Sequence, residues 1–491
     1  MLVPSKDEFL RLTSGSKPLH MPVSRDILAD METPLSAYWK LAHDETYSFL
    51  LESVTGGEQL ARYSILGVRP RLVLRTKDRK VRRITPDGEA ESALPEGQDP
   101  LHLLEAELPN TVEVPGLPKF HGGAVGMIGY DAVRFFERLP NAPTDDLNVD
   151  DLAMMLAETV IVFDHAKNLI RIIVNVPGTE QGYAQAQNEI ERIVSRLKQP
   201  IPPLPAGSFP AHPVTSNFER QGFESAVGRV KEYIAAGDGI QMVLSQRFET
   251  EVEAHPLTIY RALRSLNPSP YMFLLRFGEF DIVGASPEIL VSLQDGTARV
   301  RPIAGTRWRG NSPEEDDGLA DELLKDEKER AEHVMLVDLG RNDLGRVCEY
   351  GSVKVNDLMT IERYSHVMHI VSDVTGELEE GKSAFDLVRA SFPAGTVSGA
   401  PKVRAMQVID ELEPTARGAY AGAVGYFGYG GDMDMAITIR SILLKGGKAY
   451  VQAGAGLVYD SVPSKEFDET CNKAKACLKA IEMAQSGLEG L

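Results

Sequence analysis

Two kinds of hydrophobic pattern follow one another irregularly along the chain. Apolar residues recur with helical spacing over 219–236, 313–340, 382–391, 401–411 and 464–485. Runs that are typical of strands occupy 47–52, 155–163, 168–175, 271–276, 281–284, 289–293, 365–374, 435–444 and 448–454. Because strands and helices do not alternate regularly, the order argues against a doubly wound parallel sheet. It predicts an α+β protein with large antiparallel sheets.

A proline-rich stretch divides the chain. Residues 200–214 contain six prolines, which exclude a helix and remove hydrogen-bond donors from any strand. We therefore expect an extended connector between an N-terminal region, 1–199, and a C-terminal region, 215–491. Such a connector can also cross the surface of a single body.

A short segment occurs twice. Gly123-Ala-Val-Gly-Met-Ile-Gly-Tyr130 matches Gly422-Ala-Val-Gly-Tyr-Phe-Gly-Tyr429 at six of eight positions, and a two-strand pattern follows each copy. The match predicts an internal duplication. Only the second copy is followed by Arg440 and by the glycine-rich Gly454-Ala455-Gly456, so we expect any site to lie there.

Composition narrows the partners and the compartment. The chain has 491 residues, of which 43% are hydrophobic and 25% charged, and its formal net charge is −19. Such an acidic protein is a poor non-specific binder of nucleic acid or anionic membranes, and an anionic substrate would need local positive charge. Three cysteines form no disulfide framework. With no recognisable signal peptide or membrane-length apolar run, we expect a cytoplasmic protein.

Two pairs of glutamates have helical spacing. Glu329 and Glu332 are three residues apart, as are Glu466 and Glu469, and this spacing puts both side chains of a pair on one helix face. Two such faces opposite each other would suit Mg²⁺, which prefers carboxylate oxygen and water. The alternative is that both pairs are ordinary solvated faces. Lys473, four residues after Glu469, would then form a simple helix ion pair.

Other polar residues have less specific settings. His366 and His369 lie in an expected strand, where spacing by three points them to opposite faces, which argues against a shared zinc site. Glu288 ends the turn Gly284-Ala-Ser-Pro-Glu288 and is either a general acid over a pocket or an exposed loop residue. The loops 302–306 and 393–402 offer amides and hydroxyls to anions, but neither has the ending of a Walker loop.

Several longer motifs occur together and in order within 220–480. They are Ile240-Gln-Met-Val-Leu-Ser-Gln-Arg-Phe248, Gly284 to Glu288, Arg301-Pro-Ile-Ala-Gly-Thr306, Ala331 to Asp343, Ser365-His-Val-Met-His369, Phe392 to Lys402 and Glu466-Phe-Asp-Glu-Thr470. In this combination the chain resembles the chorismate-utilising enzyme family. The resemblance implies two orthogonally packed antiparallel sheets flanked by helices, a four-layer α/β/β/α unit to which the N-terminal region supplies strands.

The resemblance also implies roles for individual residues. Mg²⁺ would be held by Glu332 and Glu469, with Glu329 and Glu466 nearby. Glu288 would protonate a departing hydroxyl, His369 would lie over the substrate ring, and Thr396 would orient the histidine or the substrate. Chorismate's carboxylates would be held by Gly305, Thr306, Tyr420, Arg440, Gly454, Ala455, Gly456 and Lys473.

Two positions favour one reaction within the family. Gln241 stands where relatives that activate water have a lysine, and Ala304 stands where aminodeoxychorismate synthases carry a nucleophilic lysine. Both favour addition of ammonia at C2 of chorismate, loss of the 4-hydroxyl, and elimination of pyruvate to give anthranilate, the first step of tryptophan biosynthesis. The alternatives are an enzyme that stops at 2-amino-2-deoxyisochorismate, a 4-amino-4-deoxychorismate synthase, and an inactive tryptophan sensor.

The resemblance finally implies a partner and an inhibitor. The chain contains no glutaminase motif, so ammonia would come from solution or from a separate glutamine amidotransferase subunit, often in a heterotetramer. Leu50-Leu-Glu-Ser53 and Asn267-Pro-Ser-Pro-Tyr-Met272 resemble the family's tryptophan site. Ser53, Pro270, Tyr271 and Met272 would then mediate allosteric feedback inhibition.

Overall fold

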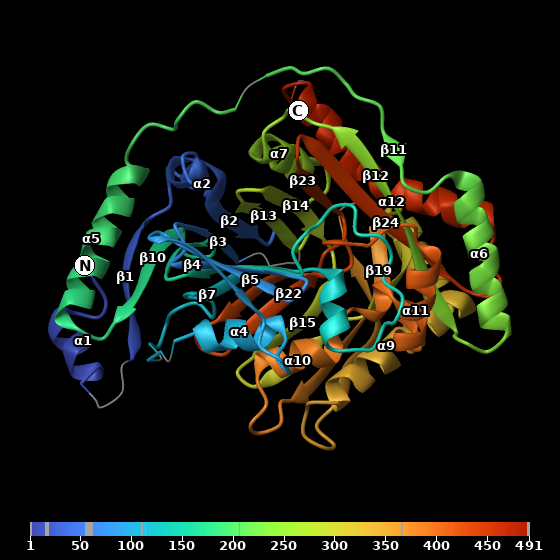
Figure 1. Ribbon diagram of the computed structural model, residues 1–491, viewed down its shortest axis with the longest axis horizontal. Helices are drawn as coiled ribbons and strands as arrows, with labels where there is room; N and C mark the ends of the chain where they lie inside the picture. The colour runs from blue at the N-terminus through green and yellow to red at the C-terminus, as the bar shows by residue number, and fades with distance from the viewer. Residues whose placement is uncertain are drawn as a thin grey trace.

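The computed structural model describes residues 2–14, 19–54, 62–109, 111–112, 114–205, 207–364 and 367–488. Within these residues the chain forms two 12-stranded antiparallel sheets, here sheet A and sheet B, with helices outside them (Figure 1). No helix in these ranges is long and apolar enough to cross a membrane.

Sheet A combines strands from both halves of the chain. Its spatial order is β1 (His20–Leu28), β10 (Leu169–Pro177), β9 (Thr159–Asp164), β3 (Tyr63–Val68), β2 (Tyr47–Glu52), β13 (Tyr271–Phe277), β14 (Phe280–Ser286), β23 (Ser441–Lys445), β24 (Lys448–Leu457), β12 (Gln241–Glu251) and β11 (Thr215–Ser216), with β20 (Gly399–Ala400) beside β12.

Sheet B is built in the same mixed way. Its order is β17 (Ile303–Trp308), β19 (Val367–Glu377), β16 (Thr297–Val300), β15 (Ile289–Gln294), β22 (Met433–Ile437), β21 (Ala423–Gly428), β7 (Gly123–Ile128), β8 (Leu152–Ala157), β4 (Leu72–Lys77), β5 (Lys80–Thr85) and β6 (Gly88–Ala93), with β18 (Lys354–Arg363) beside β19.

The described helices cover the outer faces of the sheets. They are α1 (Lys6–Leu12), α2 (Pro34–Ala42), α4 (Pro100–Glu107), α5 (Glu180–Leu197), α6 (Arg220–Ala235), α7 (Pro256–Leu266), α8 (Pro313–Lys325), α9 (Glu327–Gly345), α10 (Ala384–Ser391), α11 (Lys402–Leu412) and α12 (Pro463–Gln485), with short 3₁₀ turns η1 (Tyr130–Phe135) and η2 (Gly395–Val397).

Three apolar clusters separate four layers. One lies between sheet A and α2, α5, α7 and α12, a second lies between the two sheets, and a third lies between sheet B and α4, α9, α10 and α11. Phe273 on β13 belongs to the middle cluster and its neighbour Leu274 to the outer one. Successive side chains of a strand point to opposite faces, and here both faces are buried, which explains the nearly continuous apolar runs. The four-layer prediction is confirmed.

The duplication is confirmed in an unexpected form. The two copies of the repeated segment are the paired strands β7 and β21, and Gly126 lies directly opposite Gly425. In sheet A, β2 pairs with β13 in the same central position. Counted from the central pair toward the two edges of each sheet, every strand from the first half has a counterpart from the second half at the same position in the strand order. A local two-fold relation therefore passes through both sheets.

Three predicted elements are each divided in the structure. The 313–340 pattern forms two helices, because the Asp326 side chain accepts hydrogen bonds from the amides of Lys328 and Glu329 and begins α9. The 155–163 and 435–444 runs each form two strands, one in each sheet. Arg440, in the second of these crossings, has a left-handed φ of 52°.

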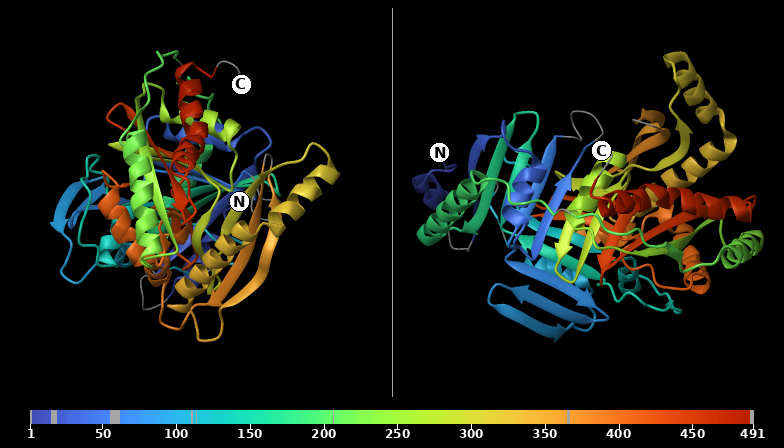
Figure 2. Two further views of the ribbon diagram at one scale, coloured as in Figure 1. Left: turned by 90° about the vertical axis from the view of Figure 1, so that its right-hand side faces the viewer. Right: turned by 90° about the horizontal axis from the view of Figure 1, so that it is seen from above.

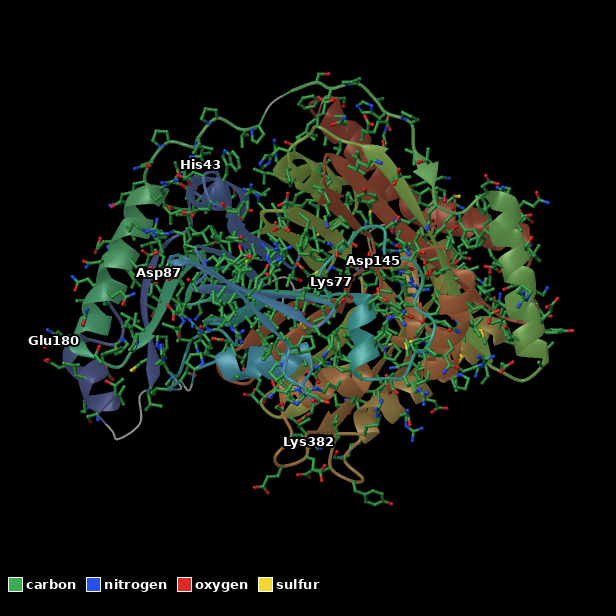
Figure 3. All side chains as sticks on the ribbon, viewed as in Figure 1. His43, Lys77, Asp87, Asp145, Glu180 and Lys382 are labelled. Atoms are coloured by element: carbon green, nitrogen blue, oxygen red, sulfur yellow. The ribbon has the colours of Figure 1, made fainter. Side chains whose placement is uncertain are left out.

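The proline-rich connector crosses the surface as an extended chain from α5 to β11 (Figure 1). Its carbonyl at Pro203 accepts a hydrogen bond from the Trp39 indole at 3.1 Å, and its Phe209 amide donates to the Gln485 carbonyl at 2.7 Å. The other views show α8 and α9 projecting from the body of the molecule (Figure 2). Side chains fill much of the space between the ribbons, while Glu180 and Lys382 mark distant points of the surface (Figure 3).

Candidate functional site

Glu288 lies where the chain passes from sheet A to sheet B, between β14 and β15. This crossing buries the residue to 9% exposure, so the structure does not place it on an exposed loop. Burial raises the pKa of the Glu288 carboxyl to about 8, and the nearby Thr396 hydroxyl and Lys473 ammonium only partly offset that rise. Thr396 lies beside the carboxyl without a hydrogen bond of regular geometry. At neutral pH Glu288 is therefore a protonated acid.

His369 is held in one orientation on β19. Its Nδ1 lies 2.8 Å from the Gly305 carbonyl oxygen and 3.2 Å from the Thr306 hydroxyl on the neighbouring β17. Because a carbonyl only accepts hydrogen bonds, Nδ1 carries a proton, and in the neutral ring Nε2 is left as an acceptor. Burial is the main cause that lowers the pKa of His369, and the Arg440 charge contributes to the same shift.

A cationic and amide-rich group is built on β24 and α12. Lys473 Nζ donates to the Gly454 carbonyl at 3.0 Å and lies 2.7 Å from a Glu469 oxygen. Arg440 donates to the Lys473 carbonyl at 2.7 Å, so the turn between β22 and β23 is tied to α12. Lys473 also contributes to the electrostatics at Glu288, and Arg440 to those at His369. These charges thus gather around the acid and the histidine.

Close packing explains the glycines of this group. A Cβ on Gly454 would lie 2.8 Å from the Tyr420 hydroxyl, and a Cβ on Gly456 would lie 2.5 Å from the Gln241 side-chain nitrogen. Both distances are too short for any other residue without displacement of these polar groups. Tyr420 is 8% exposed, and burial raises its pKa to about 12. Ala455 lies between the two glycines on β24, buried in the cluster under α6.

The two glutamate pairs lie at the edge of this region. Glu332 on α9 accepts a hydrogen bond from Gln241 at 3.2 Å. Burial and then the Glu332 charge raise the pKa of Glu329, and burial raises the pKa of Glu466, to which the Glu469 charge adds. Mutual repulsion of this kind is what a divalent cation relieves, so the residues fit Mg²⁺. Within the described ranges, no three acidic, histidine or cysteine residues already surround one metal position.

The segments expected to bind tryptophan lie side by side. Met272 on β13 pairs with Glu52 on β2, and the Val54 amide donates to the Ser269 carbonyl at 3.2 Å. Ser53 follows Glu52 at the end of β2, and Pro270 precedes Tyr271, the first residue of β13. Tyr271 pairs with Ser286 on β14, two residues before Glu288. His366 lies outside the described residues.

The first half of the chain carries different chemistry at matching positions. Gly67 and Gly284 correspond, because each lies directly opposite a phenylalanine on the preceding strand. Four residues later, Arg71 stands where the second half has Glu288. Arg71 lies 3.3 Å from the Glu158 carboxylate. The duplication has therefore kept the fold in both halves and the buried acid in one.

Comparison with known proteins assigns the chain to a family. A family model described as chorismate binding enzyme matches residues 33–479. The chain belongs to the chorismate-binding enzyme family. It is 50% identical to anthranilate synthase component 1 of Pseudomonas aeruginosa, over 99% of this chain and all of that one. It is 49% identical to the protein of the same name from Thermus thermophilus, over 95% of this chain and 99% of that one.

Solved structures of the family show the same fold. Anthranilate synthase component I from Streptococcus pneumoniae matches with a TM-score of 0.78 and 39% identity, over 92% of this chain and 99% of that one. The menaquinone-specific isochorismate synthase from Escherichia coli matches with a TM-score of 0.69 and 19% identity, over 97% and 98% of the two chains. The second likeness concerns the fold alone.

One polar residue near the expected regulatory segment was not found from the sequence. Asp434 on β22 faces Tyr271 from the other sheet, and burial raises the pKa of Asp434 to about 7. The Tyr271 hydroxyl partly offsets that rise. The only signal in the sequence is an acidic residue within an apolar strand, which is not specific enough to single it out.

Proposed function

We propose that the chain is the chorismate-aminating subunit of an anthranilate synthase, a lyase that converts chorismate and ammonia to anthranilate and pyruvate. The observation that carries this proposal is the 50% identity, over nearly the whole length, with a protein named anthranilate synthase component 1. The buried acid, the oriented histidine and the cationic group described above support the same reaction.

Two side chains favour ammonia as the nucleophile at C2. Gln241 is neutral and donates to Glu332 at 3.2 Å, so it cannot remove a proton from water. Ammonia needs no such base, because its nitrogen lone pair is already available. Ala304 on β17 offers no amino group for covalent attack. These residues support amination at C2 over the sister reactions of the family.

Glu288 and His369 supply the proton transfers. Ammonia forms a bond to C2, the ring double bonds shift, and the C4–O bond breaks as Glu288 gives its proton to the departing hydroxyl. The raised pKa of Glu288 keeps that proton in place near neutral pH. His369 presents a neutral Nε2 that either assists hydroxyl loss or removes the C2 proton when pyruvate is eliminated.

The substrate's two carboxylates need positive charge in a protein whose net charge is −19. Arg440, Lys473 and the amides of 454–456 would provide it, with the Gly305–Thr306 segment at the other side and Tyr420 donating from its protonated hydroxyl. Mg²⁺ held by Glu332 and Glu469, with Glu329 and Glu466 nearby, would neutralise one substrate carboxylate. It would thereby reduce the electrostatic repulsion between that carboxylate and the acidic protein.

A partner, a location and a regulator complete the proposal. Ammonia would come from a glutamine amidotransferase subunit, and the name component 1 of the relatives fits such an assembly, including a heterotetramer. All three cysteines are free, which fits the cytoplasm. Tryptophan would bind at Ser53, Pro270, Tyr271 and Met272 and inhibit the enzyme.

The decisive experiment supplies the purified chain with chorismate, Mg²⁺ and excess ammonium at mildly alkaline pH. Anthranilate fluorescence and an equal amount of pyruvate are expected. Chorismate loss without pyruvate would replace the proposal with an enzyme that stops at the aminated intermediate or makes 4-amino-4-deoxychorismate. A folded protein without turnover, with or without a glutaminase partner, would favour a tryptophan sensor.

A further inference from the structure

A small cavity lies behind Glu288, away from the residues expected to hold chorismate. Its volume is ≈ 40 Å³, and its wall is formed by η2, α9, the end of α10 and the start of β15. Of the predicted substrate and proton-transfer residues, only Glu288 and Thr396 contribute to that wall. The volume admits one or two water molecules and excludes chorismate, anthranilate or pyruvate.

Two hydroxyls in this wall have unused hydrogen-bonding capacity. Ser391 is 2% exposed and its hydroxyl has no hydrogen-bond partner among the described residues, while the Thr396 hydroxyl lies beside Glu288 without a hydrogen bond of regular geometry. A buried hydroxyl without a partner destabilises the fold, so buried hydroxyls normally bond to protein or to ordered water. Two such hydroxyls in the wall of one cavity indicate that water satisfies them, since a bound water needs two to four polar neighbours. Glu288 provides a further neighbour.

Charged groups connect the far end of the cavity to the surface. Asp343 on α9 forms part of the wall, and Lys402 on α11 donates to Asp343 at 2.8 Å and to the Ser391 carbonyl at 2.9 Å. The side chains of Lys402 and Asp343 are 10% and 9% exposed, so they are largely buried and keep only a small contact with solvent. Arg346 also acts on Asp343. Arg301 lines the cavity from the β16–β17 connection and is paired with Glu362.

We propose that water in this cavity returns a proton to Glu288 after each turnover, with the Ser391 hydroxyl as the fixed point of the relay. The inference rests on the proposed function, in which Glu288 loses a proton as the C4–O bond breaks and water departs. The ammonium group formed at C2 releases one proton to solvent in the same cycle. One proton therefore re-enters, and the balance closes.

The order of groups sets the path of that proton. Asp343 and Ser391 line the cavity, Lys402 donates to Asp343, and the Thr396 hydroxyl lies next to the Glu288 carboxyl. A hydroxyl relays by accepting a proton from water on one side while it gives its own to water on the other. Ser391 touches no substrate and is a positioning residue. Reprotonation of Glu288 through the cavity can occur while product still occupies the substrate site.

An isosteric pair of variants tests the relay. Ser391→Thr keeps the hydroxyl, and Ser391→Val replaces it with a methyl group of the same size, so packing changes equally in both. We expect Ser391→Val to lose about tenfold in kcat relative to Ser391→Thr, with KM for chorismate within about twofold. Equal rates for the pair, or a loss in Ser391→Val that appears in KM and not in kcat, would overturn the relay.

A neighbouring serine gives the control. Ser398 donates to the Ala394 carbonyl at 2.8 Å and does not line the cavity. Any loss in Ser398→Ala reflects packing, and it should be smaller than the loss in Ser391→Val. If both Ser391 variants fail to fold, a crystal structure of the wild-type protein decides. Ordered water bridging Ser391, Thr396 and Glu288 supports the relay, and a dry cavity overturns it. Failure of the proposed function is seen separately, as absent anthranilate in the wild type.

Discussion

Tyr271 and Ser286 lie directly opposite each other on the paired strands β13 and β14. Ser286 is two residues before Glu288, and its hydroxyl donates to the Ile437 carbonyl at 2.7 Å. Tyr271 belongs to the segment expected to bind tryptophan, and it also faces Asp434 on the other sheet. A shift of β13 therefore moves the backbone that carries the acid.

This relationship predicts the effect of removing the Tyr271 hydroxyl. In Tyr271→Phe the ring stays and the contact with Asp434 is lost, so we expect the tryptophan concentration for half inhibition to rise about tenfold, equivalent to about 1.4 kcal/mol of coupling. Without tryptophan, kcat should change by less than about threefold. Tyr63→Phe, on β3 of the same sheet, is the matched control. Unaltered inhibition in Tyr271→Phe would contradict a regulatory role for this tyrosine.

The acid role of Glu288 predicts a pH profile. With a pKa of about 8, Glu288 is protonated below that pH, so kcat should fall as pH rises through about 8. Glu288→Gln should lose about 10²–10⁴-fold in kcat with little change in KM and no alkaline fall of its residual rate. A residual rate that keeps the alkaline fall would assign it to another group.

The same group predicts a change in stability. Folding raises the pKa of Glu288 above its unfolded value, so the stabilisation is complete below the unfolded value and is lost as pH rises toward about 8. Over that window the wild type should lose up to about 1.4 kcal/mol per pH unit relative to Glu288→Gln. Urea unfolding of both proteins at pH 5, 7 and 9 measures this difference. Parallel curves would mean that Glu288 is ionised in the folded protein.

Lys473 is expected to determine substrate binding. It lies between Glu469 and the Gly454 carbonyl, so in Lys473→Met a carboxylate of chorismate loses its positive partner. We expect KM for chorismate to rise about 10–100-fold, with a smaller fall in kcat. Lys475→Met, which removes an exposed lysine that donates to the Asn472 side chain, should leave KM unchanged. An equal rise of KM in both variants would mean that the overall charge of the protein, and not a contact with Lys473, determines chorismate binding.

Metal binding is tested at the glutamate pairs. Glu332→Gln and Glu469→Gln each remove one negative charge, so the Mg²⁺ concentration for half-maximal activity should rise about tenfold or more, and high Mg²⁺ should restore part of the rate. Glu482→Gln is the control, because Glu482 lies on α12, as Glu469 does, and pairs with Lys479. Isothermal titration with Mg²⁺ alone gives a readout that does not depend on turnover. Unchanged affinity in both variants would place the ion elsewhere.

The sequence predicts the elements with simple patterns and misses those that depend on distant pairing. The helix at 464–485 is found because its apolar face repeats regularly, and it begins at Pro463 in the structure. The run 435–444 looks like one strand because no residue type marks the crossing. Its break falls at the left-handed Arg440, whose side chain donates to the Lys473 carbonyl on α12.

The site shows the same division. Motifs identify Glu288, His369 and the glycines, but their environments come from packing. The local sequence favours an exposed Glu288, whereas the sheet crossing buries it. The repeated Gly123 and Gly422 segments predict a duplication, yet nothing in either copy predicts that they pair with each other. Ser391 and Asp343 carry no distinguishing pattern, since only the closed fold brings them to one cavity.

The shared central strands have a consequence for synthesis on the ribosome. When residues 1–199 emerge, β2 and β7 are open strand edges whose partners, β13 and β21, are not yet made. The chain must be translated as far as Gly428 before β21 can close the second edge. Exposed apolar edges are prone to pair with other nascent chains. Production of this protein should therefore depend on slow translation or chaperones more than its final stability suggests.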